Sequence, residues 1–189
     1  AGTLQLTAPA GIIAVPGDLV ITGLASATNS TVTMVTNAGQ ISPTANVTLL
    51  GGGNLTLVGT NVLRGLTFDN EGAMANPTVA VGDSLTLSET AAITATNQST
   101  VTVPVISGTE LRFGSANPVI NVNAGLAATG LTISAPIAQD AAMQSLTKTG
   151  TGVLALTGAS TFTSDFTLAG GTLMLGRDTV VTTGAITSG

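Results

Sequence analysis

The sequence contains no cysteine and no histidine among its 189 residues. Without cysteine, neither a disulfide framework nor a thiolate metal site can form. Without histidine, the chain lacks the commonest general base and metal ligand and cannot build a Ser-His triad. These two absences remove several of the most frequent kinds of catalytic and metal-binding site.

Charged and aromatic residues are also scarce. Charged residues make up 7% of the chain, against about 25% in average proteins, and tryptophan and tyrosine are absent. Nucleic acids and anionic membrane surfaces require clustered lysine and arginine, so neither is an expected partner. The apolar runs fall far short of the ~18 residues that a membrane helix needs. The basic residues stand singly, at Arg64, Arg112, Lys148 and Arg177.

Short segments in which Leu, Val or Ile alternates with another residue, often threonine, recur along the chain, and helical periodicity is absent. Alternation places successive side chains on opposite faces of a strand, so we expect the aliphatic residues to face a core and the threonines to face solvent. Glycine, asparagine and proline between the segments indicate tight turns. The predicted strands are residues 4–6, 55–58, 79–81, 85–87, 101–106, 119–123, 131–133, 153–156 and 172–175.

Two all-β architectures fit this spacing. Frequent turn signals are typical of an antiparallel β-sandwich, whereas coils of about 20–25 residues with two or three strands are typical of a solenoid. Loose internal repeats favour the solenoid: AGTLQL at 1–6 resembles GGTLML at 170–175, and GNLTLVG at 53–59 resembles GTGVLALTG at 150–158. We therefore expect residues 1–189 to form a single β-helical segment, with the sandwich as the alternative.

The segment KTGTGVLALTG, residues 148–158, combines a lysine with several glycines, as phosphate-binding loops do. A P-loop, however, places its lysine after the second glycine and leads into a helix, whereas Lys148 precedes the glycines and a strand follows. The dinucleotide-binding pattern also fails, because Ala155 stands where its third glycine is required. We expect a glycine turn without nucleotide or other cofactor. Lys148 should be structural or solvent-facing, and Lys148→Ala should keep the fold.

Residues 146–176 (LTKTGTGVLALTGASTFTSDFTLAGGTLMLG) resemble the passenger-associated strand repeat of bacterial autotransporter proteins. That repeat runs from lysine through G-x-G and alternating leucines to a glycine. A polar-aromatic segment, a threonine-rich strand and G-G-T-L-hydrophobic-L-G follow. Ser160, Phe162 and Asp165 stand where asparagine, tyrosine and glycine are commoner. The matching positions are Lys148, Gly150, Gly152, Leu154, Leu156, Gly158, Phe162, Thr167, Gly171, Thr172, Leu173, Leu175 and Gly176.

The resemblance implies a right-handed parallel β-helix in a passenger-type protein that is secreted to the bacterial cell surface. In such a helix, equivalent residues of successive coils stack into ladders about 4.8 Å apart. We expect Leu154, Leu156, Leu173 and Leu175 to fill a narrow core and Thr167 to lie on an exposed ladder. Residues 61–72 and 130–139 resemble the connecting coils of similar proteins.

Three functions are compatible with these features: a non-catalytic structural stalk or fibre segment, an adhesin that binds a surface glycan or host protein, and a polysaccharide-cleaving enzyme. Asp69 and Glu71, with Arg64 nearby in sequence, are the candidates for catalysis, and with Asn70 they are the candidates for calcium. A polar turn is the expected interpretation of both, so we assign no catalytic, cofactor-binding or metal residue. The absence of Trp and Tyr also weakens the binding and enzymatic hypotheses, which favours a structural, non-enzymatic role.

Both ends of the sequence have β-like patterns without an amphipathic helix, and no charge follows Asp178. Exposed strand edges are usually covered by a helix, by charges or by proline. We therefore expect more coils of the same β-helix to pack end to end against this segment. Those coils would come from the same polypeptide or from a neighbouring subunit, and repeated head-to-tail contacts would build a filament.

Overall fold

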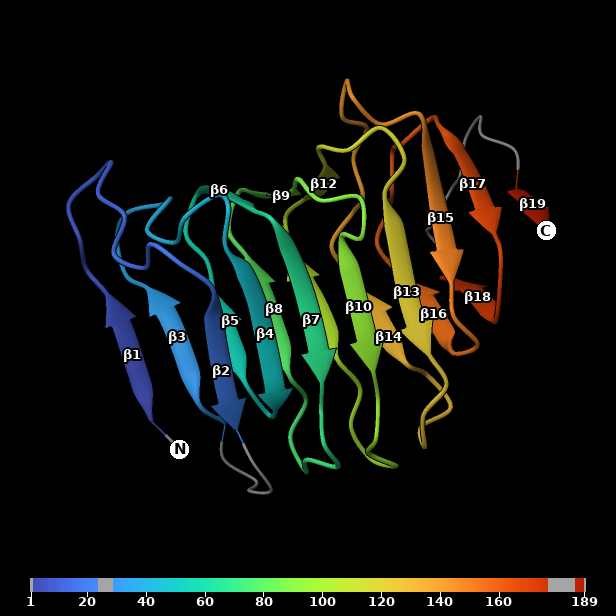
Figure 1. Ribbon diagram of the computed structural model, residues 1–189, viewed down its shortest axis with the longest axis horizontal. Helices are drawn as coiled ribbons and strands as arrows, with labels where there is room; N and C mark the ends of the chain where they lie inside the picture. The colour runs from blue at the N-terminus through green and yellow to red at the C-terminus, as the bar shows by residue number, and fades with distance from the viewer. Residues whose placement is uncertain (1, 24–28, 177–185, 189) are drawn as a thin grey trace.

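The computed structural model describes residues 2–23, 29–176 and 186–188. Every strand pairing is parallel, and the described residues contain no helix. Figure 1 shows the coils stacked along the long axis, with β1 and β19 at opposite ends. The fold is a parallel β-helix, which confirms the predicted solenoid and rejects the antiparallel sandwich.

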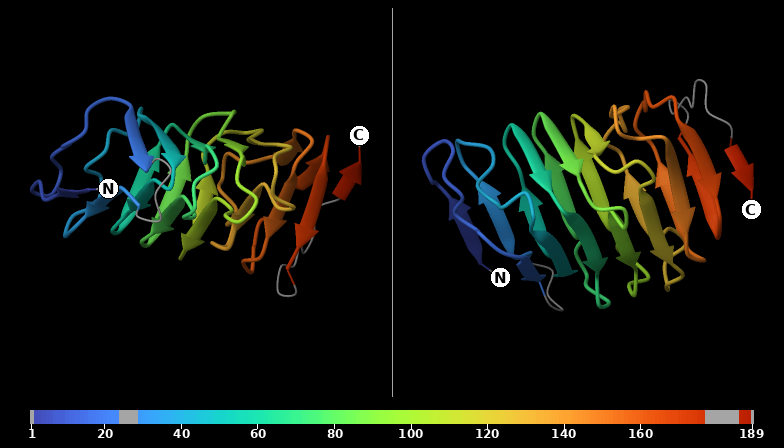
Figure 2. Two further views of the ribbon diagram at one scale, coloured as in Figure 1. Left: turned by 90° about the horizontal axis from the view of Figure 1, so that it is seen from below. Right: turned by 45° about the horizontal axis from the view of Figure 1, so that its top comes forward.

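Three parallel sheets form the walls of the stack, and Figure 2 shows them from two further directions. The first sheet contains β1 (Thr3–Leu6), β3 (Thr31–Met34), β5 (Asn54–Thr56), β8 (Thr78–Val81), β11 (Val105–Gly108), β14 (Leu131–Ile133), β16 (Val153–Leu156) and β18 (Thr172–Leu175). The second contains β2 (Leu19–Gly23), β4 (Asn46–Gly51), β7 (Gly65–Asp69), β10 (Ile93–Thr96), β13 (Val119–Asn123), β15 (Ser145–Thr149), β17 (Asp165–Leu168) and β19 (Ile186–Ser188). The third contains β6 (Thr60–Leu63), β9 (Ser84–Leu87) and β12 (Leu111–Phe113).

The core consists of aliphatic ladders that run through the stack. The longest ladder of the first sheet is Leu4, Val32, Leu55, Val79, Ile106, Ile133, Leu156 and Leu175. Its internal members are at most 5% exposed, whereas Leu4 and Leu175 are 51% and 42% exposed. The difference follows from position, because each end residue has a ladder neighbour on one side only. All four phenylalanines of the chain lie in the same core, fully buried.

Polar ladders cover the outer face, as the alternation predicts. In the second sheet one such ladder runs through Val20, Thr48, Thr67, Thr94, Asn121 and Thr149. Thr167 pairs with Thr147 on a similar ladder and is partly exposed. The wall is therefore aliphatic inside and rich in threonine outside.

The predicted core leucines divide between the interior and the end of the stack. Leu154 and Leu156 are buried, as predicted. Leu173 and Leu175 pair with them in register, but Leu173 is only partly buried and Leu175 is exposed. The prediction of burial is wrong for Leu175, because β18 is the outermost described strand of the first sheet.

The sequence pattern located β13, β14, β16 and β18 with their observed bounds. The strand predicted at 101–106 is wrong over 101–104, and only Val105 and Ile106 belong to β11. Pro104 cannot donate a hydrogen bond to a neighbouring strand, and Val101 is 73% exposed at the surface. The predicted strand ranges contain none of β2, β3, β4, β6, β7, β10, β12, β15, β17 and β19, although the repeat resemblance implies a threonine-rich strand at β17 and the C-terminal stretch was expected to be β-like.

Coil length also varies more than expected. The ladder step spans 28 residues from Leu4 to Val32 and 19 residues from Leu156 to Leu175, against the expected 20–25. The variation lies in the turns, because the ladder register is continuous. The C-terminal β-like stretch falls partly on residues 177–185, including Arg177 and Asp178, which lie outside the described residues.

Candidate functional site

The lysine of the glycine-rich segment lies inside the core. Lys148 is completely buried and occupies one step of an inward ladder in the second sheet. The ladder members from Leu19 to Leu168 are otherwise aliphatic, and Ser188 follows them at the end of the stack. The aliphatic members are Leu19, Val47, Leu66, Ile93, Ile120 and Leu168. Of the two alternatives predicted for Lys148, the structural one is confirmed and the solvent-facing one is wrong.

Three backbone carbonyls surround the ammonium group of Lys148. Nζ donates hydrogen bonds to the carbonyl oxygens of Thr149 at 2.8 Å, Gly150 at 2.9 Å and Gly170 at 3.0 Å. Burial lowers the pKa of Lys148 below its ordinary value. The carbonyls oppose that effect, because a neutral amine offers two N–H groups rather than three. With its three donors engaged, the ammonium has none left for a phosphate group.

Glycine is required in the turns around Lys148 because the backbone of neighbouring coils passes very close. Gly150 has φ +75°, and a Cβ there would lie 2.3 Å from the carbonyl oxygen of Val122. Gly171 has φ +69°, and its Cβ would lie 2.3 Å from the carbonyl oxygen of Gly152 and 2.8 Å from Nζ of Lys148. The glycine pattern that resembles a phosphate loop therefore serves coil packing.

The other residues of the repeat also serve packing. A Cβ added to Gly152 would lie 2.4 Å from the carbonyl oxygen of Asn123, and one added to Gly158 would lie 2.6 Å from that of Ser134. A Cβ added to Gly176 would lie 2.9 Å from the Cα of Thr157. Phe162 is completely buried. The glycines of the repeat therefore let neighbouring coils approach, and Leu154, Leu156 and Phe162 fill the core, whereas Thr167 and Thr172 lie at the surface.

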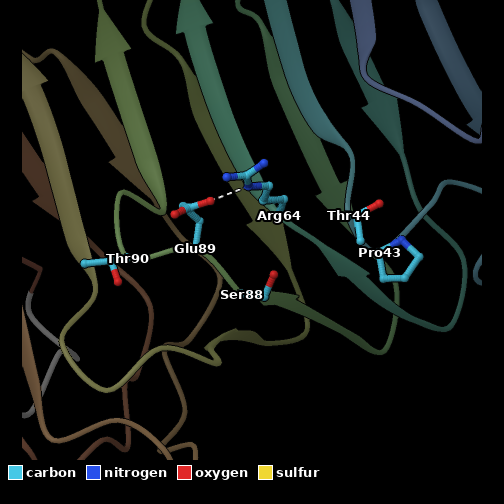
Figure 3. A pocket seen from close by; sticks show the side chains of 6 residues that line it. All are labelled: Pro43, Thr44, Arg64, Ser88, Glu89 and Thr90. Carbon is cyan, nitrogen blue, oxygen red and sulfur yellow. Dashed lines mark hydrogen bonds and ion pairs between the residues drawn. The ribbon is translucent and has the colours of Figure 1, made fainter.

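A shallow polar groove lies at the corner between the third and second sheets (Figure 3). Its volume is about 330 Å³. Arg64 precedes β7, while Ser88 to Thr90 follow β9 on the next coil. The lining residues are Pro43, Thr44, Arg64, Ser88, Glu89 and Thr90.

The charged pair of this groove is Arg64 with Glu89. Nε of Arg64 donates to the Glu89 carboxylate, and this hydrogen bond raises the pKa of Arg64 above its ordinary value. Arg64 therefore stays protonated and cannot exchange a proton with a ligand. Two of the lining hydroxyls are already engaged, since Thr90 bonds Ser115 at 2.9 Å and Ser88 donates to the Leu63 carbonyl at 3.3 Å. The groove can orient a small polar molecule but offers no acid–base pair.

The structure does not bring the candidate acidic pair to Arg64. Asp69 ends β7, whereas Arg64 immediately precedes the start of that strand. The Asp69 carboxylate accepts hydrogen bonds from Nε2 of Gln98 at 2.8 Å and from the backbone N–H of Glu71 at 3.3 Å. Glu71 itself has φ +44°, in the left-handed region. This geometry is that of a polar turn.

A buried polar network lies beside that turn, and the sequence analysis missed it. Nδ2 of Asn70 donates to Oδ1 of Asn97, and Nδ2 of Asn97 donates to the carbonyl oxygens of Thr102 at 2.9 Å and Thr129 at 3.0 Å. The hydroxyl of Thr102 donates to the Ala73 carbonyl at 3.0 Å. The available signal was an asparagine at the same position of two successive coils, directly after β7 and β10.

Comparison with protein-family models, curated proteins and solved structures gives no match to this chain. The resemblance to the autotransporter repeat therefore rests only on the sequence pattern of residues 146–176 and, less specifically, of 61–72 and 130–139. Within the described ranges, no group of three acidic side chains is placed to hold a metal ion, and no helix has the length and hydropathy to cross a membrane.

Proposed function

We propose that this chain is a non-catalytic structural segment of a β-helical stalk or fibre at a bacterial surface. The observation that carries the proposal is the uncovered core at the N-terminal end of the stack. There β1 and β2 each have a strand neighbour on one side only, and Leu4, the end member of the inward ladder of the first sheet, is 51% exposed. An apolar strand edge of this kind is a template for another strand.

The covering element is a further coil of the same kind. Leu4 continues the ladder that ends in Leu175, so a coil with an aliphatic residue in register would bury both. Such a contact is head-to-tail, and repetition builds a filament rather than a closed ring. The bacterial, extracellular setting is supported by the resemblance of residues 146–176 to the autotransporter repeat.

The side-chain arrangement supports a passive role. The ammonium group of Lys148 donates all its hydrogen bonds to backbone carbonyls, and Arg64 is paired with Glu89. The outer faces present threonine ladders, and all four phenylalanines are buried, so no aromatic platform for a sugar is exposed. These features suit a spacer better than the alternative adhesin or hydrolase.

The test is to follow the particle size of residues 1–189 by light scattering and electron microscopy as concentration rises. Linear particles should form, and Leu4→Asp, which places a charge on the open core end, should shorten them. Thr67→Asp, at a partly exposed position in the middle of the outer face, is the matched control. A stable monomer at high concentration, with β1 and β2 protected from hydrogen exchange, would refute the proposal.

A further inference from the structure

A second inward ladder runs through the first sheet, two residues before each member of the long aliphatic ladder. Backbone hydrogen bonds continue the register at this level: the N–H of Thr31 donates to the Gly2 carbonyl at 2.9 Å, and that of Asn54 donates to the Ser30 carbonyl at 2.8 Å. Along the stack the members change from small residues through proline to leucine. In chain order they are Gly2, Ser30, Gly53, Pro77, Pro104, Leu131, Leu154 and Leu173.

The small members leave a hollow at the N-terminal end of the core. A groove of about 340 Å³ opens there between β1, β2 and β3. A Cβ added to Gly2 would meet no atom within 4 Å, so close packing does not require this glycine. The residues that line the groove include Gly2, Leu4, Leu19, Ile21, Ser30 and Val32.

The opposite end of the same ladder carries a leucine. Leu173 lies on β18, the outermost described strand of the first sheet, beside the buried Leu154 (Figure 1). Its side chain packs against the core but stays partly exposed. At one level of one sheet, therefore, the N-terminal end lacks the aliphatic group that the C-terminal end presents.

The two end strands also lack the features that keep strand edges apart. Charged residues and proline on an edge strand prevent it from pairing with another chain. β1 (TLQL) and β18 (TLML) contain neither. Both alternate as the paired strands inside the stack do, so their free edges can accept a parallel neighbour.

We propose that Leu173 of one copy fills the hollow beside Gly2 of the next copy when two chains stack end to end. β18 of the first copy pairs in parallel with β1 of the second, about 4.8 Å away. Leu175 then lies beside Leu4, and Leu173 lies beside Gly2. This contact rests on the proposed end-to-end stacking and adds its register and the side chains that recognise each other.

The hollow also gives the stacking a direction. Two N-terminal ends placed together would join two hollows and leave a cavity, which is unfavourable. Only the leucine-bearing end fills the groove, so the contact is head-to-tail. A lipid surface is a poorer occupant, because it would leave the edge N–H and C=O groups of β1 and β2 without hydrogen-bond partners, whereas a strand pairs them.

The cysteine-free sequence allows the register to be tested by cross-linking between single-cysteine variants under mild oxidation. In the proposed register Met174 lies beside Thr3, whereas a slip of two residues, which keeps the same faces, places it beside Gln5. Thr3 and Gln5 are both exposed on β1, so they form a matched pair. Thr3→Cys mixed with Met174→Cys should form disulfide-linked dimers at least about tenfold faster than Gln5→Cys mixed with Met174→Cys.

A second experiment fills the hollow from within the chain. Gly2→Leu should raise the concentration needed for linear particles at least about tenfold, because Leu173 of the next copy can no longer be buried there. Gln5→Leu adds the same side chain to the exposed face of β1 and should assemble like the original chain. Leu173→Ala should also weaken assembly on its own, yet it should partly restore assembly when combined with Gly2→Leu, because the two changes exchange the large and the small side chain.

The outcomes separate this contact from the broader end-to-end stacking. Equal assembly of Gly2→Leu and the original chain would overturn the proposed contact but not the stacking. Faster cross-linking of Met174→Cys with Gln5→Cys than with Thr3→Cys would do the same. An original chain that stays monomeric at every concentration would refute both.

Discussion

Replacement of Lys148 by methionine is expected to destabilise the C-terminal coils, although it makes this inward ladder of the second sheet apolar from Leu19 to Leu168. Methionine has a similar length, so the packing against Ile120 and Leu168 is largely kept. The loss is the ammonium group, which links the turn at 149–150 to the turn at Gly170 on the next coil. The question is whether removal of a buried charge compensates for carbonyls left without a donor.

The opposing magnitudes favour destabilisation. Methionine avoids the desolvation penalty of the buried ammonium group, which stabilises the folded state by several kcal/mol. Against this, each carbonyl left buried without its donor costs about 1–3 kcal/mol, and three are involved. The three carbonyls together cost about 3–9 kcal/mol, so we expect them to outweigh the relief and to leave a net loss of stability.

Lys148→Ala should be worse than Lys148→Met, because it adds a cavity that costs about 2–5 kcal/mol. That sum approaches the ~5–15 kcal/mol stability of a whole domain. We therefore replace the expectation that Lys148→Ala keeps its fold with its opposite: at least the coils around β15 to β18 should unfold. That expectation left open a solvent-facing lysine, whereas Lys148 is completely buried.

The measurement is urea unfolding combined with hydrogen exchange read by mass spectrometry. In Lys148→Met, exchange should accelerate in β15 to β18 and stay unchanged in β1 to β8, because a coil contacts only its neighbours. Thr147→Ala, on the same strand but partly exposed, is the control. If Lys148→Met unfolds within about 0.5 kcal/mol of the original chain, as an ordinary surface change does, the three hydrogen bonds do not hold the coils.

Three further results are expected. Leu156→Ala should cost about 2–5 kcal/mol and Thr167→Ala under about 0.5 kcal/mol, and equal losses in urea unfolding would contradict the assignment of faces. Burial lowers the pKa of folded Lys148 below the ordinary 10.5, so the unfolded chain binds more protons between the two values. Stability should therefore rise with pH up to about 10.5. A rise of the same size in Lys148→Met would assign the effect to other groups. Asn97→Ala should cost about 1–3 kcal/mol by leaving the Thr102 and Thr129 carbonyls unpaired, and it should loosen exchange in residues 97–104.

Sequence reasoning recovered the strands whose pattern was strongest. In β13, β14 and β16, aliphatic residues alternate over the whole strand, and turn residues flank both ends, so the bounds were found. β10 (ITAT) was missed because it contains a single large aliphatic residue, and β12 (LRF) because the charged Arg112 stands at its centre. Their strand structure depends on pairing with the coils on either side.

The position of Lys148 could not be predicted from the sequence. Alternation puts Lys148 on the same face as Leu146, but its charge is expected to keep a lysine in solvent, since buried lysine is rare. Its burial depends on carbonyls from two turns that are 20 positions apart, at Gly150 and Gly170, and on glycine at both. Only the stacked coils bring those acceptors together. The same limit applies to Val101, whose alternating neighbours resemble a strand while the residue itself lies in an exposed turn.

The strands of the stack are constrained in length, whereas its turns vary. A residue inserted into a strand would move every later side chain of that strand to the wrong face, so length can vary only at the corners. At the tight corners even a methyl group is excluded: a Cβ on Gly53 would lie 2.4 Å from the Ile21 carbonyl oxygen. Such corners cannot present a side chain to a partner. Met74 lies in one of the long turns instead, where the buried Asn70–Asn97 contact supports the added residues. Ladder packing and turn length can therefore change independently in this fold, and the most exposed aliphatic side chains, Met74, Val101 and Leu126, lie in the long turns.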